Sequence, residues 1–442
     1  MKIGLFLVLG CLFFSCQHTN TLEREPAGGK LGSRWGKKAV KEYFLNATPE
    51  ERNEALARAE IFTEAWRVDQ VPQVDLVGET QLRCGPDYKM LPAKVQVEDR
   101  FSSGDFSSSK TFESYQWSKV SCDYHPDVEK SMGGGSTKFL CDFPDTEAPD
   151  SKRTKKVRYA SSSSDPLDSE VVESTIASNL ARLIGLPTKM FCPARISCKG
   201  CPSSNPWRDD RAAKGPGRKT IDFDWALVES TVEAYIISTK VQGNAPNGLN
   251  WSELKNVKAD SEDERQKKLI EREAWLLWVS FLQQTDAGDF NLRLICLEPE
   301  KTQDEKYSCK RPAIYVHDYG HSFYRHLTYS KWAKIPVFSR SDANSGCRLG
   351  FNKDELPRRA AIDGIILGAE ISAEARDLLL ARLSAVSDSQ WITLFQMARA
   401  EEATERTSAE WLKDVKKKLQ NMRSAQCLPF AAGKSVLFKS SP

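Results

Sequence analysis

The sequence predicts an α+β protein with two lobes, a small lobe built on a mixed sheet and a larger, mainly helical lobe, preceded by an N-terminal accessory region. Short apolar runs broken by Ser and Gly, typical of strands, fill residues 71–160. Apolar residues at helical spacing mark residues 165–186, and the pattern is helical from residue 354 to about 426. The 442 residues are 40% apolar and 28% charged, which excludes disordered, collagen-like and coiled-coil chains.

Residues 1–15 are predicted to be an export signal. One basic residue precedes an apolar run that is too short to cross a bilayer as a mature helix. The ending Phe14-Ser15-Cys16 resembles a bacterial lipobox, which implies that Cys16 is lipidated and becomes the mature N-terminus. An ordinary secretory signal cleaved nearby is the alternative. Residues 16–35, rich in Gly, Ser, Thr and charge, then form a tether.

Export would place the cysteines in a compartment that permits disulfides. Apart from Cys11 and Cys16, ten of the 12 cysteines remain, an even number that predicts a disulfide framework. The alternative is a zinc site at Cys192, Cys198 and Cys201, because a C-x2-C pair with a third thiol nearby is half of a metal site. No His lies close to these three residues, which favours disulfides.

The accessory region, residues 36–130, is predicted to begin with two helices over residues 36–66. Thr48 caps the second of these helices, and Pro49 occupies its first turn. The remainder of the region is predicted to be β-rich.

The small lobe, residues 131–223, is predicted to start with two strands on either side of a glycine turn. A helix over residues 165–186 follows, with Asp165 as its N-cap and Gly185 as its stop. A loop rich in Pro, Gly and basic residues occupies the end of this lobe.

The large lobe, residues 224–430, is predicted to contain a helix that ends near Gln284. Two β-runs follow, over residues 292–297 and 313–316, with a charged loop between them. Helices complete the lobe.

Three polar residues around these β-runs have the order of a phosphoryl-transfer site. The chain presents a helix, D-x4-N, a strand pair and D-x-G, so Asp286 is the candidate catalytic base and Asn291 and Asp318 are candidate metal ligands. Oxygen donors of this kind suit Mg²⁺, and a positioned carboxylate can orient an attacking hydroxyl. Cys296 and Cys309 flank the loop between the strands, so a disulfide between them would clamp the arms that carry Asn291 and Asp318.

Candidate nucleotide-binding residues lie in the small lobe. A glycine-rich turn can bring backbone N–H groups near phosphate, and cations on a strand can pair with a helix carboxylate to hold the phosphates. Lys156 and Arg158 share a strand face because side chains alternate, and Glu170 and Glu173 share a helix face. The candidates are Gly133, Gly134, Gly135, Lys138, Lys156, Arg158 and Glu173.

Together these motifs resemble the atypical kinase-like superfamily that includes phosphatidylinositol kinases, bacterial toxin kinases and secretory-pathway kinases, and most of all exported bacterial proteins of that kind. The likeness covers residues 130–425 and implies a two-lobed kinase-like fold with ATP and Mg²⁺ or Mn²⁺ between the lobes. The lysine that contacts nucleotide in the superfamily corresponds here to Arg158, with Lys156 or Lys138 as possible substitutes.

The sequence therefore predicts an exported, lipid-anchored, kinase-like protein of the bacterial cell envelope, facing the periplasm, lying in the outer membrane or secreted. Its expected reaction is transfer of a phosphoryl group from ATP to a hydroxyl of a protein, lipid or glycan. The alternatives are a pseudokinase or disulfide-stapled binding lipoprotein without catalysis, and a hydrolase that uses His317 with Asp318 or paired carboxylates. A net charge of +3 gives no argument for nucleic acid, and a monomer is expected.

Overall fold

The computed structural model describes most of the chain between residues 43 and 431. The described residues are 43–63, 75–84, 88–98, 109–125, 137–144, 152–160, 170–201, 219–229, 235–239, 249, 253–254, 256–284, 291–301, 307–320, 322–323, 329–342, 346–350 and 369–431. The predicted export signal, the tether and Cys16 lie outside them. Among the described residues, no helix is long and apolar enough to cross a membrane.

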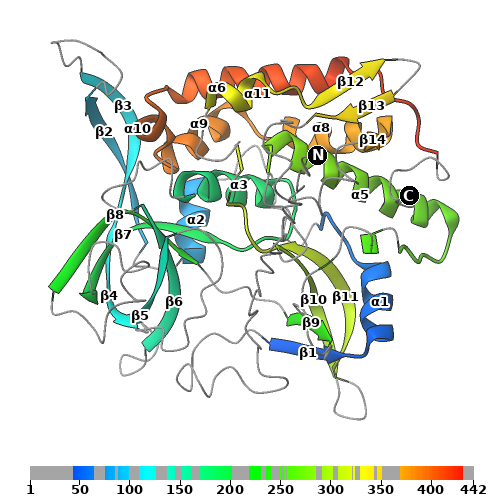
Figure 1. Ribbon diagram of the computed structural model, residues 1–442, viewed down its shortest axis with the longest axis horizontal. Helices are drawn as coiled ribbons and strands as arrows, with labels where there is room; N and C mark the ends of the chain where they lie inside the picture. The colour runs from blue at the N-terminus through cyan, green and yellow to red at the C-terminus, as the bar shows by residue number, and fades with distance from the viewer. Residues whose placement is uncertain are drawn as a thin grey trace, which may run out of the picture.

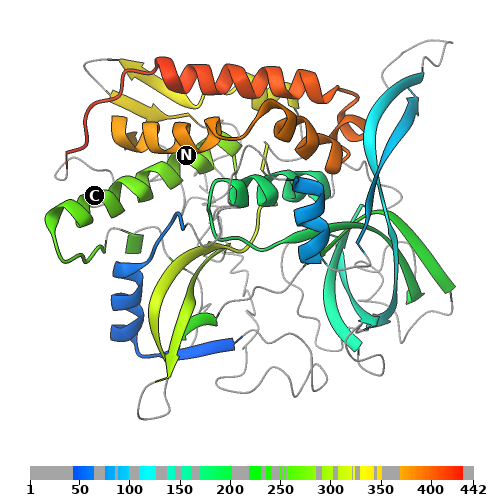
Figure 2. The same ribbon diagram turned by 180° about the vertical axis from the view of Figure 1, so that it is seen from behind.

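The fold is α+β, as the sequence predicts, and Figure 1 shows its parts. A barrel of strands lies at one end, a separate four-stranded sheet lies beside it, and a layer of helices covers both. Figure 2 shows the same arrangement from behind, with helix α3 in the middle between the helical layer and the barrel.

Five strands close the barrel in the order β4-β5-β6-β8-β7. Aromatic side chains fill it, with the ring of Phe223 5.2 Å from that of Phe139 and 4.8 Å from that of Tyr159. The strands are β4 (Lys119–His125), β5 (Lys138–Pro144), β6 (Lys152–Tyr159), β7 (Phe191–Cys201) and β8 (Lys219–Glu229). The barrel therefore starts inside the predicted accessory region and ends beyond residue 223.

Helix α3 (Val171–Leu183) packs against the barrel, and every one of its residues is buried. It follows Glu170, which adopts a left-handed φ of 59°, and the chain turns away after it at Gly185, whose φ of 83° suits a residue without Cβ. The predicted stop at Gly185 is confirmed, while Asp165, the predicted cap, lies outside the described residues. Helix α2 (Leu76–Cys84) lies near β7 and was not predicted.

The second sheet has the order β1-β9-β10-β11. Its strands are β1 (Tyr43–Ala47), β9 (Tyr235–Thr239), β10 (Leu292–Lys301) and β11 (Tyr307–Val316). The prediction of helix around Tyr43 was wrong, because residues 43–47 pair in parallel with β9, a partner far along the chain. Helix α1 (Pro49–Arg58) packs on β11 and begins with the predicted cap, in which Thr48 and Glu51 bond reciprocally.

The helical layer has a core of aromatic rings packed against one another. Trp332 lies 5.9 Å from Trp411 and 5.2 Å from Phe323, measured between ring centroids. A small sheet, β12 (Phe338–Asp342), β13 (Gly346–Leu349) and β14 (Glu370–Ile371), borders this layer. Its helices are α5 (Glu262–Leu282), α6 (Tyr329–Lys334), α8 (Ala373–Ser384), α9 (Asp388–Met397), α10 (Ala400–Thr404) and α11 (Ser408–Ser424).

A two-stranded hairpin, β2 (Met90–Glu98) and β3 (Ser109–Trp117), projects from the molecule beside α10 (Figure 1). Its base is fixed to the helical layer by Trp117, whose indole N–H donates to the carbonyl of Met397 at 2.8 Å. The guanidinium of Arg399 lies 3.8 Å from the centre of the Trp225 ring and 4.9 Å from that of Trp117.

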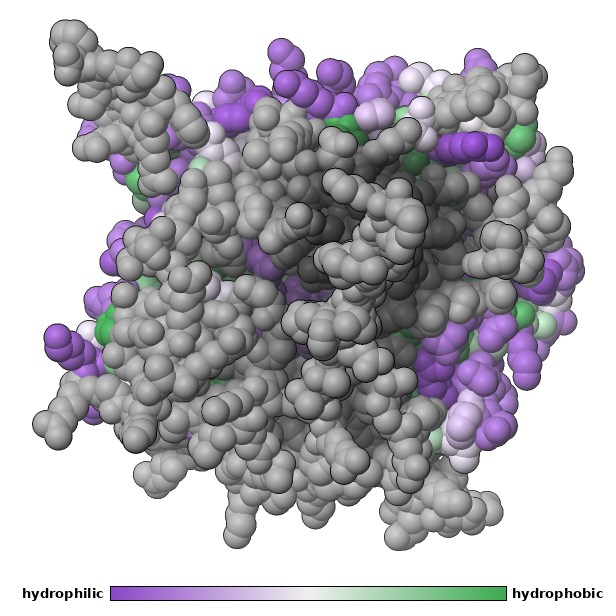
Figure 3. Space-filling view, viewed as in Figure 1, coloured by the Kyte–Doolittle hydropathy of each residue, from purple (hydrophilic) through white to green (hydrophobic). Residues whose placement is uncertain are grey.

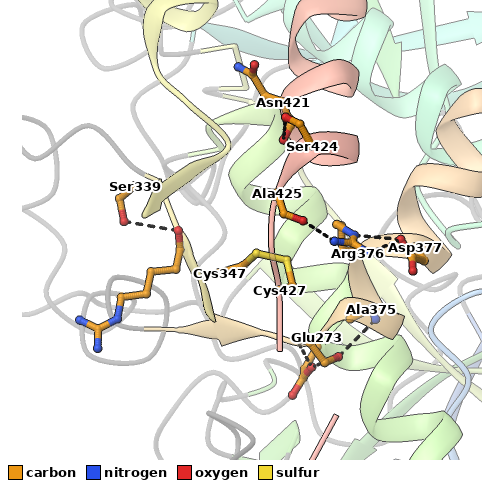
Figure 4. Close-up of a disulfide and its surroundings, with 12 residues drawn as sticks. Glu273, Ser339, Cys347, Ala375, Arg376, Asp377, Asn421, Ser424, Ala425 and Cys427 are labelled. Carbon is orange, nitrogen blue, oxygen red and sulfur yellow. Dashed lines mark hydrogen bonds and ion pairs between the residues drawn. A yellow bond between two sulfur atoms is a disulfide. The ribbon is translucent and has the colours of Figure 1, made fainter. Parts of the chain in front are cut away.

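All ten described cysteines form five disulfides, so the zinc alternative at Cys192, Cys198 and Cys201 does not hold in this state. The bonds are Cys84–Cys192, Cys122–Cys141, Cys198–Cys201, Cys296–Cys309 and Cys347–Cys427. Figure 4 shows the last of these, which joins the segment after α11 to β13, while Arg376 donates to the carbonyl of Ala425 at 2.5 Å. The C-terminal segment is held further by the carbonyl of Leu428, which accepts from the Ala373 N–H at 2.8 Å, and by the Phe430 N–H, which donates to Glu374 at 2.7 Å.

The coloured surface in Figure 3 is largely hydrophilic along the upper edge, over α11. The exposed face of α11 includes Lys413, Lys416, Lys417 and Arg423. Among the described residues, Leu91 and Leu428 are the exposed large apolar side chains. Leu91 lies on β2 and Leu428 in the segment after α11.

Candidate functional site

Arg158, on β6, is the centre of a network of charges. Its guanidinium binds three carboxylates, at 2.8 Å from Glu229, 2.7 Å from Glu170 and 2.5 Å from Asp318. These residues come from β8, the turn before α3 and the turn after β11, so one side chain links the barrel, the central helix and the second sheet. Only 1% of the Arg158 side chain is exposed.

Glu229, at the end of β8, collects cations in the same way. Its carboxylate lies 2.5 Å from Lys189, 2.8 Å from Arg158 and 3.0 Å from Lys156. With Glu170 and Asp318 counted, three carboxylates balance these three cations, and Lys138 nearby adds a fourth cation. Glu229 and Lys189 were not predicted from the sequence. Glu229 could have been found as the acidic residue that ends the apolar run of β8.

The register of the barrel explains why these cations gather on one face. Lys138 pairs with Arg158, and Arg158 pairs with Leu227, so these three side chains point to the same side of the wall. Phe139 and Val157 point the opposite way, into the barrel core. The charge network therefore lies on the outer face of the barrel, toward α3.

The turn after β11 brings Asp318 to this face. Val316 donates its N–H to the carbonyl of Pro187 at 3.0 Å and forms a β-bridge with Thr188, which fixes the end of β11 beside the segment that leads into β7. Gln284 donates to the carbonyl of Asp318 at 2.7 Å. The end of α5 and the D-Y-G turn are therefore in direct contact.

Gly320, the glycine of that turn, allows a close approach. A Cβ at this position would lie 2.5 Å from Oε2 of Glu170, so only glycine lets the Glu170 carboxylate lie against the turn without a shift. The Gly320 N–H also donates to Oδ1 of Asp318 at 2.8 Å. Both oxygens of Asp318 thus have partners, one Arg158 and the other this N–H.

The network shifts the pKa values of its members. Burial alone would lower the pKa of Arg158, but the carboxylates of Asp318, Glu229 and Glu170 raise it well above its ordinary value. Burial alone would raise the pKa of Glu229, and its three cations hold it well below the ordinary range. These pairs are therefore fully ionised at neutral pH.

Lys138 and His317, two further basic groups beside this network, have lowered pKa values. Burial, with Lys156 and Arg158 nearby, lowers the pKa of Lys138 to about 7. Burial, with Arg293 and Lys189 nearby, lowers the pKa of His317 well below its ordinary value, so this imidazole is neutral at pH 7. An added anion would reverse the effect on both groups, because it stabilises their charged forms.

The structure brings together some of the predicted site residues. Lys156, Arg158 and Asp318 meet in the network, and Asn291 lies next to it, because its carbonyl accepts the N–H of His317 at 2.8 Å. Glu170, rather than Glu173, is the helix-side acid that bonds Arg158; Glu173 is buried one turn further along α3. Asp286 and the turn Gly133 to Gly135 lie outside the described residues. A disulfide joins Cys296 and Cys309 across the β10–β11 hairpin.

The donor set has the chemistry for Mg²⁺ or Mn²⁺, since Asn291 supplies an amide and Asp318 a carboxylate. The Oδ2 atom of Asp318, however, is bound by Arg158. Asp318 can bind a metal ion through Oδ2 only if this ion pair opens. Otherwise the ion has to bind the second oxygen, Oδ1.

No protein-family model and no curated protein matches the chain. Among solved structures, the crystal structure of a Helicobacter pylori proinflammatory kinase, CtkA, aligns with 70% of this chain and 95% of that chain. The identity is 8% and the TM-score is 0.33. A likeness of this size assigns neither fold family nor activity.

Proposed function

We propose that the chain is a kinase-like phosphotransferase that binds ATP with Mg²⁺ or Mn²⁺ and transfers a phosphoryl group to a hydroxyl of a protein, lipid or glycan. The observation that carries this proposal is the bridge made by Arg158, which joins a strand cation to an acid at the start of a helix and to the aspartate of a D-x-G turn. Kinases use the same three kinds of group to hold phosphates and metal.

In this proposal each residue has one task. Arg158, Lys156 and Lys138 bind phosphate oxygens, and the backbone of Gly133 to Gly135 covers them. Glu170 and Glu229 hold the cations in place. Asn291 and Asp318 hold the metal ion, which when bound neutralises phosphate charge. Asp286 orients the acceptor hydroxyl and receives its proton.

A thermal-shift titration of the chain with its disulfides intact tests this proposal. ATP with Mg²⁺ or Mn²⁺ is expected to raise the melting temperature, because a ligand at 100 times its Kd adds about 2.7 kcal/mol to stability. The variant Asp318→Asn is expected to lose the metal-dependent part of the shift. Asp224→Asn is the matched control, since Asp224 is an exposed acid that pairs with Arg195 on the barrel.

Two results would contradict the proposal. The first is no shift with either metal ion. The second is a shift of equal size in Asp318→Asn and wild type, which would place the nucleotide elsewhere. With labelled ATP, release of phosphate or transfer of the labelled phosphoryl group to envelope extracts then distinguishes turnover from binding.

A binding protein without catalysis is the second candidate, and the Arg158–Asp318 ion pair favours it. With Oδ2 on Arg158 and Oδ1 on the Gly320 N–H, Asp318 already has a partner for each oxygen. This candidate predicts a nucleotide shift that persists when EDTA replaces the metal ion, with no phosphoryl transfer.

We also propose export and lipid anchoring through Cys16, with the cell envelope as the location. Five disulfides support an oxidising compartment. Labelling of cells with a radioactive fatty acid is expected to mark the wild-type chain and to fail in Cys16→Ser. Unchanged labelling in Cys16→Ser would exclude this anchor.

A further inference from the structure

Arg293, on β10, is a half-buried cation of the second sheet that lies outside the ion pairs around Arg158. Its Nε atom is buried and, within the described part of the chain, has no hydrogen-bond partner. Its guanidinium also forms no ion pair with a described carboxylate, whereas Arg158 binds three. A cation that is partly removed from water without a carboxylate is costly, so this position favours an anion supplied from outside the chain.

The register of β10 and β11 places Arg293 on the same face as Asn291, a proposed metal ligand. Arg293 lies opposite Tyr315 in the antiparallel pair. The next pair on that face is Asn291 with His317, because the His317 N–H donates to the Asn291 carbonyl at 2.8 Å. Residues on the other face, such as Leu294, belong to the apolar core. Arg293 is therefore two residues, or about 7 Å, along the strand from Asn291.

This face of the second sheet meets the charge network at His317. Arg293 and Lys189 lie close enough to the His317 imidazole to lower its pKa, while Glu229 acts on it in the opposite direction. Lys189 is itself bonded to Glu229 at 2.5 Å. The cations of the network share its carboxylates, so Arg293 adds a positive charge that these carboxylates do not pair with.

We propose that Arg293 forms an oxyanion-binding position and holds the terminal phosphate of ATP beside Asn291 and Asp318. This role rests on the proposed function, because Asn291 and Asp318 define where that phosphate lies. A guanidinium can bind phosphate through two parallel N–H···O bonds, and Nε is one of the donors for such a pair. A cation at this position also stabilises the charge on the phosphoryl group during transfer.

The role of Arg293 has a consequence for specificity. ADP lacks the phosphate that Arg293 is proposed to bind, so Arg293 is expected to set the preference of the site for a triphosphate over a diphosphate. Hydrogen bonds to charged groups contribute enough that the loss of this contact is expected to weaken binding by about 10- to 100-fold.

The test measures binding of ATP and of ADP, each with Mg²⁺, by calorimetric titration of the full chain with its disulfides intact. Wild type is expected to prefer ATP by about 10-fold or more. Arg293→Met is expected to lose this preference through weaker ATP binding, with ADP binding unchanged. Arg293→Lys keeps the charge but not the planar fork, so a smaller loss for ATP alone is expected. It gives the same test if Arg293→Met does not fold.

Arg311→Met is the matched control on the same sheet. Arg311 pairs with Glu60 and Glu298 and lies five residues before Val316, or about 17 Å along β11 from the end of that strand at the site. This variant is expected to bind both nucleotides as wild type does.

Equal weakening of ATP and ADP in a folded Arg293→Met chain would overturn the role of Arg293, and so would ATP binding at the wild-type affinity. Wild type that binds neither nucleotide would instead contradict the proposed function. Titration with tripolyphosphate then tests the oxyanion position by itself. Binding that Arg293→Met weakens by about 10-fold supports this position, whereas equal binding or no binding overturns it.

Discussion

At the scale of single residues, the charge network depends on an arginine rather than a lysine at position 158. Lysine has one charged nitrogen, whereas guanidinium offers five N–H donors in a plane. In this chain Nε reaches Glu229, and the two terminal nitrogens reach Glu170 and Asp318. An ammonium group could not span carboxylates on three separate elements in this way.

Arg158→Met is expected to lower the free energy of unfolding by about 3–5 kcal/mol, because it leaves three carboxylates without their shared cation. Arg158→Lys keeps the charge but not the fork, so its stability is expected to fall between those of Arg158→Met and wild type. Urea unfolding measures both. The control Arg195→Met removes a cation from the exposed pair with Asp224, which is expected to cost about 1 kcal/mol or less. Equal losses in the two methionine variants would refute the central role of Arg158.

Lys418, on α11, makes the free energy of unfolding depend on pH. It is 1% exposed, donates to the carbonyl of Ile335 at 2.7 Å and lies over the Trp332 ring. Burial lowers its pKa from 10.5 to about 7 in the folded chain. Between these two values the unfolded chain holds the proton and the folded chain has released it, so the contribution of Lys418 to stability rises with pH.

The stability of wild type minus that of Lys418→Met is therefore expected to increase from about pH 7 to about pH 10 and to level off below pH 7. Urea unfolding at several pH values measures this difference. Lys413→Met, on the exposed face of the same helix, is the control and is expected to give a flat difference. A flat difference for Lys418→Met as well would show that this lysine stays charged in the folded chain.

At the scale of elements, the β2–β3 hairpin depends on a few contacts at its base. Two strands alone are marginally stable in water, so the hairpin needs support from the helical layer. Arg399 supplies it by lying between Trp117 and Trp225, and its partner Glu402 accepts a hydrogen bond from Ser114 at 2.7 Å.

Arg399→Leu is expected to loosen this hairpin without unfolding the rest. A desolvated cation–π contact is worth about 2 kcal/mol, so amide exchange over residues 90–117 is expected to become faster by roughly 30-fold. Hydrogen exchange with mass spectrometry localises the change. Arg348→Leu, which removes a cation from an exposed pair with Glu370, is expected to leave the hairpin unchanged. Hairpin exchange at the wild-type rate in Arg399→Leu would assign its support to other contacts.

The elements that the sequence predicted best are those whose signal is local. The end of α5 near Gln284, the Thr48-Pro49 cap of α1 and the stop at Gly185 depend on neighbouring residues, and the structure has all three. Strand β1 was predicted to be helix, because its pairing with β9 is distant in sequence and its short apolar run alone does not indicate a strand. Helix α2 lies in a stretch that was predicted to be β-rich, and its buried Cys84 is bonded to Cys192 on the barrel.

At the scale of the whole molecule, the site is assembled from parts that no local pattern connects. Arg158, Glu229, Glu170 and Asp318 lie on different elements, and only the packing of barrel, α3 and second sheet brings them together. The residue types could be predicted from motifs, which is why Arg158 and Asp318 were expected. The choice of Glu170 over Glu173 depends on the left-handed turn before α3, which the sequence did not indicate.

The Cys84–Cys192 disulfide is expected to be the most stabilising of the cross-links in the barrel, because it joins positions 108 residues apart. In the chain-entropy model, closing a loop of this size raises the free energy of the unfolded chain by roughly 4.7 kcal/mol. The Cys198–Cys201 bond joins residues that are only 3 positions apart, so the corresponding increase is roughly 2 kcal/mol. The double variant Cys84→Ser with Cys192→Ser is therefore expected to lose about 3–5 kcal/mol in denaturant unfolding, and Cys198→Ser with Cys201→Ser about 2 kcal/mol. Near-UV circular dichroism checks that both variants keep their packing. A larger loss for the Cys198 and Cys201 variant would mean that contacts inside the barrel, rather than loop length, set the value of these bonds.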